Sequence, residues 1–502
     1  MTQHETFEVE PEDARAPLVL ALDVGSTATR GAVYDATGLP VGKRVKERHA
    51  FTTGADGTST IDPDQVCDEV GEVLTRLAER DHGVPVSGVA MDTFAASLVG
   101  VGADGRALTP CFTYADSRSA AQVGELRDRL DETVVQQRTG TRLHTSYLAP
   151  RLLWLRETQP DVVARVTTWM SLGEYVQQRL LGTTVASTPV AAWGGLLDRR
   201  TGTWDPEMLD ACRTSPEQLS PVQDPGVPLP GVDAARVAER WPSLAAASWF
   251  PVIADGLASN LGTGAGDASS MGASAATSGA VRVLVRGVPD RVPPGLWCYR
   301  VDAHRSLLGG AVNDVGRLVA WLEETLRLPD DDALDAVLAA EPDPRVPTVV
   351  PFLSGERSTG WAASARAVLA DVSAGTTPEA LFRGSAEGVA TSYARVVEQL
   401  VEVAGTPERV VASGRITQAL PHLLQVVADA IGSPVQRVDL KRATLRGTAL
   451  LALETLSPDV VRAAVPLAAT YEPQAGRSAH YAAVRARFEE LYGASQARPA
   501  GT

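Results

Sequence analysis

The chain has 502 residues, more than a single hydrophobic core usually supports, so we expect two domains. Its 46 Lys and Arg residues against 61 Asp and Glu residues give a formal charge of −15, which disfavours a nucleic-acid partner, and a content of 44% hydrophobic and 21% charged residues is typical of a globular protein. Residues 1–17 lack an apolar signal core, and no later run approaches the ~20 apolar residues of a membrane span, so we expect a cytoplasmic protein that makes no membrane contact.

The four cysteines, at positions 67, 111, 212 and 298, lie far apart and form no C-x-x-C pair. This spacing favours neither a zinc ribbon nor a disulfide framework, and it suits a reducing compartment. The seven histidines contain no HExxH motif, so the sequence gives no support to a histidine metal site.

The first strong pattern, LVLALDVGSTATRGAVY over residues 18–34, predicts a hairpin of two buried strands joined by a polar turn. Asp23 stands at the mouth of this turn. Gly25 allows an unusual backbone geometry, and Ser26 and Thr27 add amide and hydroxyl donors, a combination that suits a phosphate. An ordinary hairpin with a polar turn would show the same residues.

A helix is expected from Asp62-Pro63 onward, with one apolar face, and a strand from Val86 that places Asp92 and Thr93 at its end. Ligands commonly bind at such strand ends in α/β folds. The G-x-G-x-x-G spacing over residues 100–105 is not a dinucleotide fingerprint, because an Asp-Gly hairpin turn and a strand follow it where the fingerprint needs a helix.

Residues 113–118, TYADSR, set an acid and a base two positions apart before a helix. Residues 251–256, PVIADG, return to a strand followed by Asp-Gly, and SAATSGAVRVLV from Ser274 repeats the hydroxyl turn inside a hairpin. Two such units half a chain apart predict two related domains. A strand, glycine turn and helix follow from Leu307 and again from Val410, and a long helix opens after Thr377.

The segment D-x-G-S/T-x-x-x-R at residues 23–30 matches the first phosphate-binding segment of the actin-like ATPases, and the chain as a whole resembles the FGGY carbohydrate kinases. LHTSYLAPRLLWLRE at residues 143–157 and WMSLGEYVQQRLLG at residues 169–182 are most similar to the gluconate kinase branch. The resemblance implies an α/β fold of two actin-like (ribonuclease H-like) ATPase domains that face each other across a cleft. We expect tails at 1–17 and 495–502, a sugar-side domain at 18–249 and a nucleotide-side domain at 250–494.

The resemblance also implies an activity, the ATP-dependent phosphorylation of a hydroxyl of gluconate or a related sugar acid. Asp255 would be the general base, taking the hydroxyl proton late in the transfer, and Asp23 with Asp255 would hold Mg²⁺. Further nucleotide contacts are expected at Gly25, Ser26, Thr27, Arg30, Thr277, Ser278, Gly279, Asn313, Gly414 and Arg415. Sugar contacts are expected at Asp92, Thr93, Asp116, Arg118, His144, Asp255, Glu356 and Arg357.

Four positions depart from the family pattern: Ala95 and Ala96 replace Trp-His, Ala276 replaces a glycine, and Arg415 replaces the second glycine of the adenosine loop. The alanine pair would enlarge or depolarise the sugar pocket, and Arg415 would weaken ATP binding or redirect the site towards another donor. A xylulose or polyol kinase, a catalytically weak sugar or nucleotide sensor, and another actin-like ATPase therefore stay open as alternatives. The expected partners are a small sugar and ATP, and a homodimer is possible because long apolar helices suit either a core or a subunit contact.

Overall fold

The computed structural model describes residues 7–496. The chain divides into two compact units, and each unit collects segments that are distant in sequence. The first unit comprises Met1–Gly262, Cys298–Ser306 and Lys441–Ala464, and the second comprises Thr263–Trp297, Leu307–Leu440 and Val465–Thr502.

The central sheet of the first unit has the strand order β14-β6-β1-β2-β3, and β15 also pairs with β6. β1 and β2 form the predicted antiparallel hairpin, whereas β6 runs parallel to β1 on its other side. The strands of this sheet are β1 (Leu18–Val24), β2 (Ala28–Tyr34), β3 (Pro40–Arg48), β6 (Val86–Thr93), β14 (Ser248–Trp249) and β15 (Ile253–Ala254).

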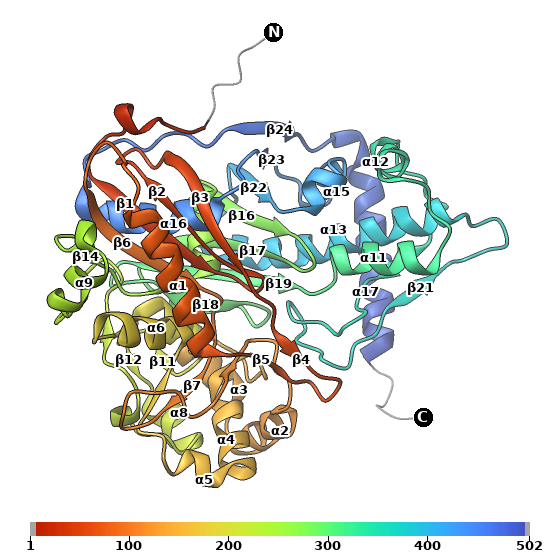
Figure 1. Ribbon diagram of the computed structural model, residues 1–502. Helices are drawn as coiled ribbons and strands as arrows, with labels where there is room; N and C mark the ends of the chain where they lie inside the picture. The colour runs from red at the N-terminus through yellow and green to blue at the C-terminus, as the bar shows by residue number, and fades with distance from the viewer. Residues whose placement is uncertain (1–6, 497–502) are drawn as a thin grey trace. The chain divides into compact units, whose positions relative to one another are not determined.

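Every residue of β1 is buried, because helices cover both faces of the sheet. Side chains alternate between the faces of a strand. The even-numbered residues of β1 pack with α1 (Pro63–Ala78), and Val19 and Ala21 pack with α16 (Ala443–Leu456) on the opposite face (Figure 1). Asp62 caps α1 by accepting a hydrogen bond from the Asp64 amide, as the Asp-Pro start predicts.

α10 (Asp255–Gly262) crosses α16 at a contact that only glycine permits. A Cβ atom on Gly262 would lie 1.7 Å from the Ala443 carbonyl oxygen, and one on Gly447 would lie 1.7 Å from the Ala258 carbonyl oxygen. The two backbones therefore touch directly.

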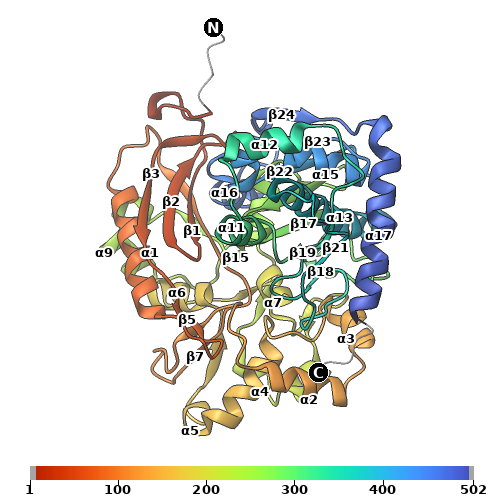
Figure 2. The same cartoon turned by 90° about the vertical axis from the view of Figure 1, so that its right-hand side faces the viewer.

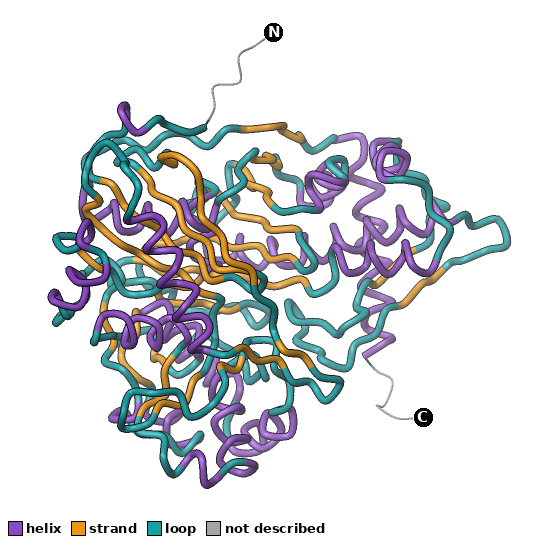
Figure 3. Tube along the Cα trace, viewed as in Figure 1, coloured by secondary structure: helices purple, strands orange, loops and turns teal. Residues whose placement is uncertain are grey.

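The remainder of the first unit is mainly helix and loop, with several short strand pairs (Figure 3). Its own apolar core gathers residues from Leu98 to Leu219. Its elements are η1 (Pro11–Asp13), β4 (Thr52–Thr53), β5 (Ser59–Ile61), β7 (Val99–Val101), β8 (Cys111–Phe112), α2 (Ala120–Arg129), α3 (Glu132–Thr139), α4 (Leu148–Thr158), α5 (Pro160–Val163), β9 (Thr168–Met170), α6 (Leu172–Leu181), β10 (Ala186–Ser187), α7 (Thr188–Gly194), β11 (Leu197–Asp198), β12 (Thr203–Trp204), α8 (Pro206–Ala211), η2 (Pro216–Gln218), β13 (Val222–Gln223), α9 (Ala234–Arg240) and η3 (Pro242–Leu244).

The second unit is built on strands in the order β19-β17-β16-β22-β23-β24. As in the first unit, an antiparallel hairpin, here β16–β17, has a parallel strand beside it, here β22. The predicted pair of related domains is therefore visible in the sheet topology. The strands are β16 (Ser270–Ala275), β17 (Gly279–Arg286), β19 (Arg305–Val312), β20 (Thr348–Val350), β21 (Val368–Ala370), β22 (Arg409–Ser413), β23 (Val435–Val438) and β24 (Leu467–Tyr471), whereas most of β18 (Trp297–Arg300) falls in the Cys298–Ser306 segment of the first unit.

The longest helix of the second unit, α13 (Pro378–Ala404), starts where the sequence predicts. Thr377 caps it by accepting a hydrogen bond from the Ala380 amide. α15 and α17 pack against α13 (Figure 2). The other helices of this unit are α11 (Gly316–Thr325), α12 (Asp331–Ala339), α14 (Ile416–Ala419), α15 (Leu423–Ile431), η4 (Ala475–Arg477) and α17 (Ser478–Gln496).

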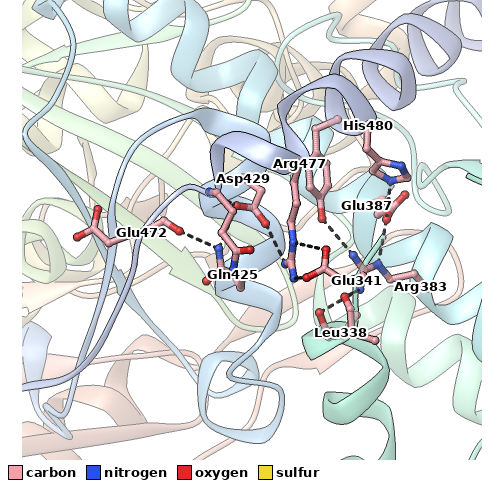
Figure 4. Close-up of polar contacts among 12 residues, drawn as sticks. Leu338, Glu341, Arg383, Glu387, Gln425, Asp429, Glu472, Arg477 and His480 are labelled. Atoms are coloured by element: carbon pink, nitrogen blue, oxygen red, sulfur yellow. Dashed lines mark hydrogen bonds and ion pairs between the residues drawn. The ribbon is translucent and has the colours of Figure 1, made fainter. Parts of the chain in front are cut away.

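A network of charged side chains, buried except for Glu341, ties these helices together (Figure 4). Arg383 donates to Glu387 at 2.9 Å and also to carbonyl oxygens at the end of α12. Arg477 pairs with Glu341 at 2.8 Å and with Asp429 of α15 at 3.3 Å. Because every charge in it has a partner, the network serves to fix the helices.

Residues 7–17 differ from the predicted loose tail. The Val9 amide donates to the Pro40 carbonyl at 3.0 Å, and the Ala36 amide donates to the Arg15 carbonyl at 2.8 Å. Residues 1–6 and 497–502 lie outside the described part of the chain, and α17 extends to Gln496, past the expected start of the second tail at 495.

The expected boundary at 249/250 also differs from the observed division, because β15 completes the first sheet and α16 returns from late in the sequence to cover it. After β7, Gly102–Gly105 forms a turn in which the Gly105 amide donates to the Gly102 carbonyl at 2.9 Å, as predicted. All four cysteines are buried and unpaired. Within residues 7–496, none of the helices combines the length and apolar composition needed to cross a bilayer.

Candidate active site

Three aspartates meet at the carboxyl ends of three parallel strands in the first unit. Asp23 of β1 lies opposite Asp92 of β6, and Ala254 of β15 lies opposite Thr93, so Asp255 comes one residue beyond the strand end. We expected Asp23 and Asp255 to come from different halves of the molecule. They belong instead to one unit, because the β15 segment joins the sheet that β1 begins.

Of the three aspartates, Asp92 is fully buried. Burial, followed by the negative charge of Asp23, holds the pKa of Asp92 well above its usual value. Thr448 of α16 donates to Asp92 Oδ2 at 2.5 Å, whereas Asp92 Oδ1 has no hydrogen-bond partner among the described residues. With Thr93 also buried, neither residue offers a surface to a sugar, contrary to the sequence expectation.

Asp23 is paired with Arg30 across the hairpin. Burial raises the pKa of Asp23, although Arg30, at 3.2 Å, opposes the rise. Arg30 also donates to the Thr27 hydroxyl at 3.2 Å, so its guanidinium spans the turn. Gly25 does not adopt a positive φ, contrary to our expectation. A Cβ atom at this position would lie 3.0 Å from Arg30 Nη1, so glycine serves here to leave room for the arginine.

Asp255 begins α10 and is half-buried, and it accepts a hydrogen bond from the Gly256 amide at 2.8 Å. The partial positive charge of a helix N-terminus favours the ionised carboxylate. An ionised, half-buried carboxylate is the form that can accept a proton from a bound hydroxyl.

The acid and base of the TYADSR segment form an ion pair. Arg118 Nη2 lies 2.6 Å from Asp116 Oδ2, and the guanidinium stacks over Trp154 with its carbon 4.4 Å from the ring centroid. Asp116 is buried and also accepts from the Ser59 amide at 3.0 Å. Asp116 therefore orients Arg118, whose partly exposed side chain is the one of the two that can meet a ligand.

Arg151 of α4 organises the loops around this pair, and sequence reasoning missed it. Its fully buried guanidinium donates to the carbonyl oxygens of Ala96 and Thr113, each at 2.9 Å, and of Thr145 at 3.2 Å. Burial lowers its pKa to about 10, which leaves it charged at neutral pH. The sequence signal was a lone arginine within the apolar run LAPRLLWL.

His144 lies in one of the loops that Arg151 holds. Its Nδ1 atom accepts from the Ser146 amide at 3.1 Å, which makes the ring part of the turn before α4. Ala96 adopts a positive φ of 56°, and with Phe94 it is buried, so the alanine pair lies on a constrained loop.

In the second unit, the turn between β16 and β17 exposes Thr277 and Ser278. The amides at the start of α11 hold its carbonyl groups: Gly316 N donates to Ala276 O at 2.8 Å and Arg317 N donates to Thr277 O at 3.1 Å. Gly279 must be glycine, because a Cβ atom there would lie 2.0 Å from the hydroxyl oxygen of Tyr393.

Asn313, Gly414 and Arg415 also lie in the second unit. Asn313 Nδ2 donates to the Gly355 carbonyl at 2.8 Å. Gly414 has a φ of +118°, and a Cβ atom would lie 2.2 Å from the Ala275 carbonyl oxygen, so strand packing alone requires glycine here. Arg415 is exposed at the start of α14.

Glu356 is committed to the fold of the second unit. Its buried carboxylate lies 2.6 Å from Arg395 Nη1 and also accepts from the Thr359 amide and the Tyr492 hydroxyl. These partners occupy both oxygens, contrary to the expected sugar contact. Arg357 beside it is half-buried, and its Nε atom has no hydrogen-bond partner among the described residues.

Family models and relatives agree with this architecture. Residues 18–227 match the N-terminal domain, and residues 271–455 the C-terminal domain, of the FGGY family of carbohydrate kinases. A gluconokinase of Bacillus licheniformis is 22% identical over 87% of each chain, and a xylulose kinase of Lactococcus lactis subsp. lactis is 24% identical over 86% of this chain and 87% of the other.

Among solved structures, a gluconate kinase from Lactobacillus acidophilus superposes with a TM-score of 0.88 at 25% identity, covering 96% of this chain and 98% of that one. The similarity thus spans both units and nearly the full length of the relatives. The chain belongs to the FGGY family of carbohydrate kinases.

Proposed function

We propose that this carbohydrate kinase transfers the γ-phosphoryl group of ATP to a hydroxyl of gluconate or a related sugar acid. The observation that carries the proposal is the group of three aspartates at neighbouring strand ends, beside a hydroxyl-rich turn, in a family whose members phosphorylate carbohydrates. The similarity to gluconokinases supports the choice of acceptor.

In the proposed reaction, the acceptor oxygen attacks the γ-phosphorus atom and the bond to the ADP oxygen breaks. The hydroxyl proton passes to Asp255. Because a carboxylate with an ordinary pKa of ~4 cannot remove an alcohol proton in advance, Asp255 orients the hydroxyl first and takes the proton late. Arg30, which spans the Asp23 turn, supplies positive charge next to the exposed Ser26 and Thr27.

The carboxylate group suits a hard divalent cation. Among residues 7–496, no three His, Cys, Asp or Glu side chains are grouped so as to hold a metal by themselves. Mg²⁺, however, commonly binds through one or two carboxylates, water and substrate phosphates, and Asp23 and Asp255 offer that set. When bound, the ion would neutralise phosphate charge.

A neutral sugar such as xylulose is the second candidate acceptor, because Asp116 already neutralises Arg118 at 2.6 Å. A sugar acid needs surplus positive charge, whereas a ketose needs only donors and acceptors of hydrogen bonds. The similarity to xylulose kinases supports this alternative equally.

The test is ADP release with MgATP and, separately, gluconate, xylulose, ribulose and glycerol. We expect gluconate to give the highest kcat/KM. A higher value for xylulose would overturn the sugar-acid assignment. If every acceptor gave only the ADP released by ATP alone, while one of them bound tightly in calorimetry, the protein would be a sensor. The Asp255→Asn variant serves as the catalytic blank.

A further inference from the structure

His49 supports the Gly25–Thr27 turn through contacts from its ring and its backbone amide. Its Nε2 atom lies 2.7 Å from the Gly25 carbonyl oxygen, and its backbone amide donates to the Thr27 carbonyl at 3.2 Å. The imidazole side chain is fully buried. One residue thus contacts the carbonyl groups of both Gly25 and Thr27.

The other ring nitrogen of His49 is tied to α1. Nδ1 lies 2.7 Å from Glu69 Oε2, the oxygen that also accepts from the Thr29 hydroxyl at 2.9 Å. Gln65 donates to the second oxygen of Glu69 at 2.9 Å. A continuous path of hydrogen bonds therefore runs from α1 through Glu69 and His49 to the turn.

Both ring nitrogens face oxygen atoms, which requires both to donate, and only imidazolium has two N–H groups. Burial opposes the charge, but the hydrogen bonds to Glu69 and Gly25 outweigh it, so the pKa of His49 is raised. Burial likewise opposes ionisation of Glu69, but the bonds from His49, Gln65 and Thr29 lower its pKa overall. The other charged groups that act on the ring are Arg30 of β2, which disfavours its charge, and Asp23 of β1.

We infer that His49 and Glu69 are positioning residues for the phosphoryl donor: the charged ring fixes the Gly25–Thr27 turn so that its amides and hydroxyls can hold phosphate oxygens. The inference deepens the proposed function and depends on the phosphate-binding role assigned there to this turn. Neither residue touches the reacting atoms, so the effect falls on donor binding and leaves the acceptor untouched.

The expected pH dependence follows from the sign of the shift. The pKa of His49 is raised in the folded protein. The support that the two ring N–H groups give to the turn is therefore complete below the ordinary histidine pKa of ~6.5, and it is lost as the pH rises through the raised value. A neutral ring keeps a single N–H group and must abandon either Gly25 or Glu69. The KM for ATP should therefore rise on the alkaline side.

The experiment compares His49→Gln and Glu69→Gln with the wild type in calorimetric titrations with ADP and in steady-state kinetics. A hydrogen bond to a charged group contributes ~1.5–3 kcal/mol, so we expect His49→Gln to weaken ADP binding about tenfold or more. The KM for the sugar should change less than about twofold. In both variants the alkaline rise of the KM for ATP should disappear.

His82→Gln is the matched control, because His82 is also buried in the first unit and its Nε2 atom contacts a single carbonyl, that of Leu77 at 2.8 Å, at the far end of α1. It should bind ADP like the wild type. Unchanged ADP binding and an unchanged pH profile in folded Glu69→Gln would overturn the inference even if His49→Gln failed to fold. If the wild type itself bound no ADP, the proposed function would fail first.

Discussion

The two units contain the same hairpin with different chemistry at its end. In the first unit, β1 places Asp23 opposite Asp92 of the parallel strand β6. In the second unit, β16 places Ser274 opposite Ser413 of the parallel strand β22. Each pair lies at the same place in its sheet, next to an exposed hydroxyl turn. The shared topology thus supplies two turns, whereas the carboxylates that can manage a proton or a cation occur in one of them alone.

The groups that support the two turns also differ in chemistry. The first turn is held by a charged side chain, His49, whereas the second is held by the backbone amides of α11 and by the Tyr393 hydroxyl, which donates to the Ser274 carbonyl at 2.7 Å. The first turn therefore depends on a titratable side chain, whereas the second depends on backbone amides and a tyrosine hydroxyl. Substitutions in the two units should have different consequences.

The largest effect is expected for Asp255→Asn, which removes the proposed general base. General-base catalysis contributes typically ~10²–10⁴-fold, so we expect kcat to fall about 10³-fold with little change in the KM for the sugar. The rate of ADP release at saturating concentrations of ATP and sugar measures kcat. Asp131→Asn is a suitable control, because Asp131 only caps α3 and asparagine caps equally well. Retention of more than a tenth of the activity would remove Asp255 from the mechanism.

For Glu356→Gln in the second unit, we expect a loss of folding stability without a change in sugar binding. Removing one member of a buried ion pair costs ~3–5 kcal/mol, because Arg395 would keep an uncompensated charge. Denaturant unfolding should show this loss of stability, while the KM for the sugar in the remaining folded protein should not change. A large rise of that KM with stability intact would restore the sugar contact that the sequence suggested.

Arg151→Met should combine both kinds of effect at an intermediate size. The change leaves three carbonyl groups without their donor, at a cost of about 2 kcal/mol in unfolding free energy. It should also raise the KM for the sugar about fivefold or more, since the loops bearing Arg118 and His144 lose their common anchor. Arg151→Lys keeps the charge but lacks the fork of donors, so it should recover only part of the loss.

The smallest effect is expected for Tyr393→Phe under the second turn. It deletes one hydrogen bond of ordinary strength, worth about 1 kcal/mol, and leaves the ring packing intact. Thermal unfolding should shift slightly, and ADP binding should weaken less than in His49→Gln. An effect as large as that of His49→Gln would show that the two turns are supported equally, and the contrast between the units would fail.

Much of the local structure followed directly from the sequence. The hairpins at Asp23 and Thr277, the Asp62 and Thr377 caps and the rejection of the glycine motif after Val99 all depend on neighbouring residues, and the structure bears them out. Local patterns are sufficient where the stabilising contact is a turn or a cap. The family was predicted in the same way and is confirmed by the matching domain models.

The site was less predictable, because burial and pairing depend on segments far apart in the chain. Asp92 and Glu356 look like ligands in the sequence, but Asp92 is fully buried and Glu356 is paired with Arg395. His49 and Arg151 look unremarkable in the sequence, since their roles arise from carbonyl groups that carry no sequence signature. Acidic residues next to glycine can be found by pattern, whereas the side chains that hold them cannot.

The crossing of α10 and α16 has a consequence for how relatives of this chain can diverge. Asp255 begins one helix and Thr448 lies on the other, so the spacing between the proposed general base and the partner of Asp92 is set where Gly262 meets Gly447. The two glycines lie almost 200 positions apart in sequence, yet neither can acquire a side chain unless the opposite backbone withdraws. Across a large set of homologous sequences, both positions should therefore remain glycine.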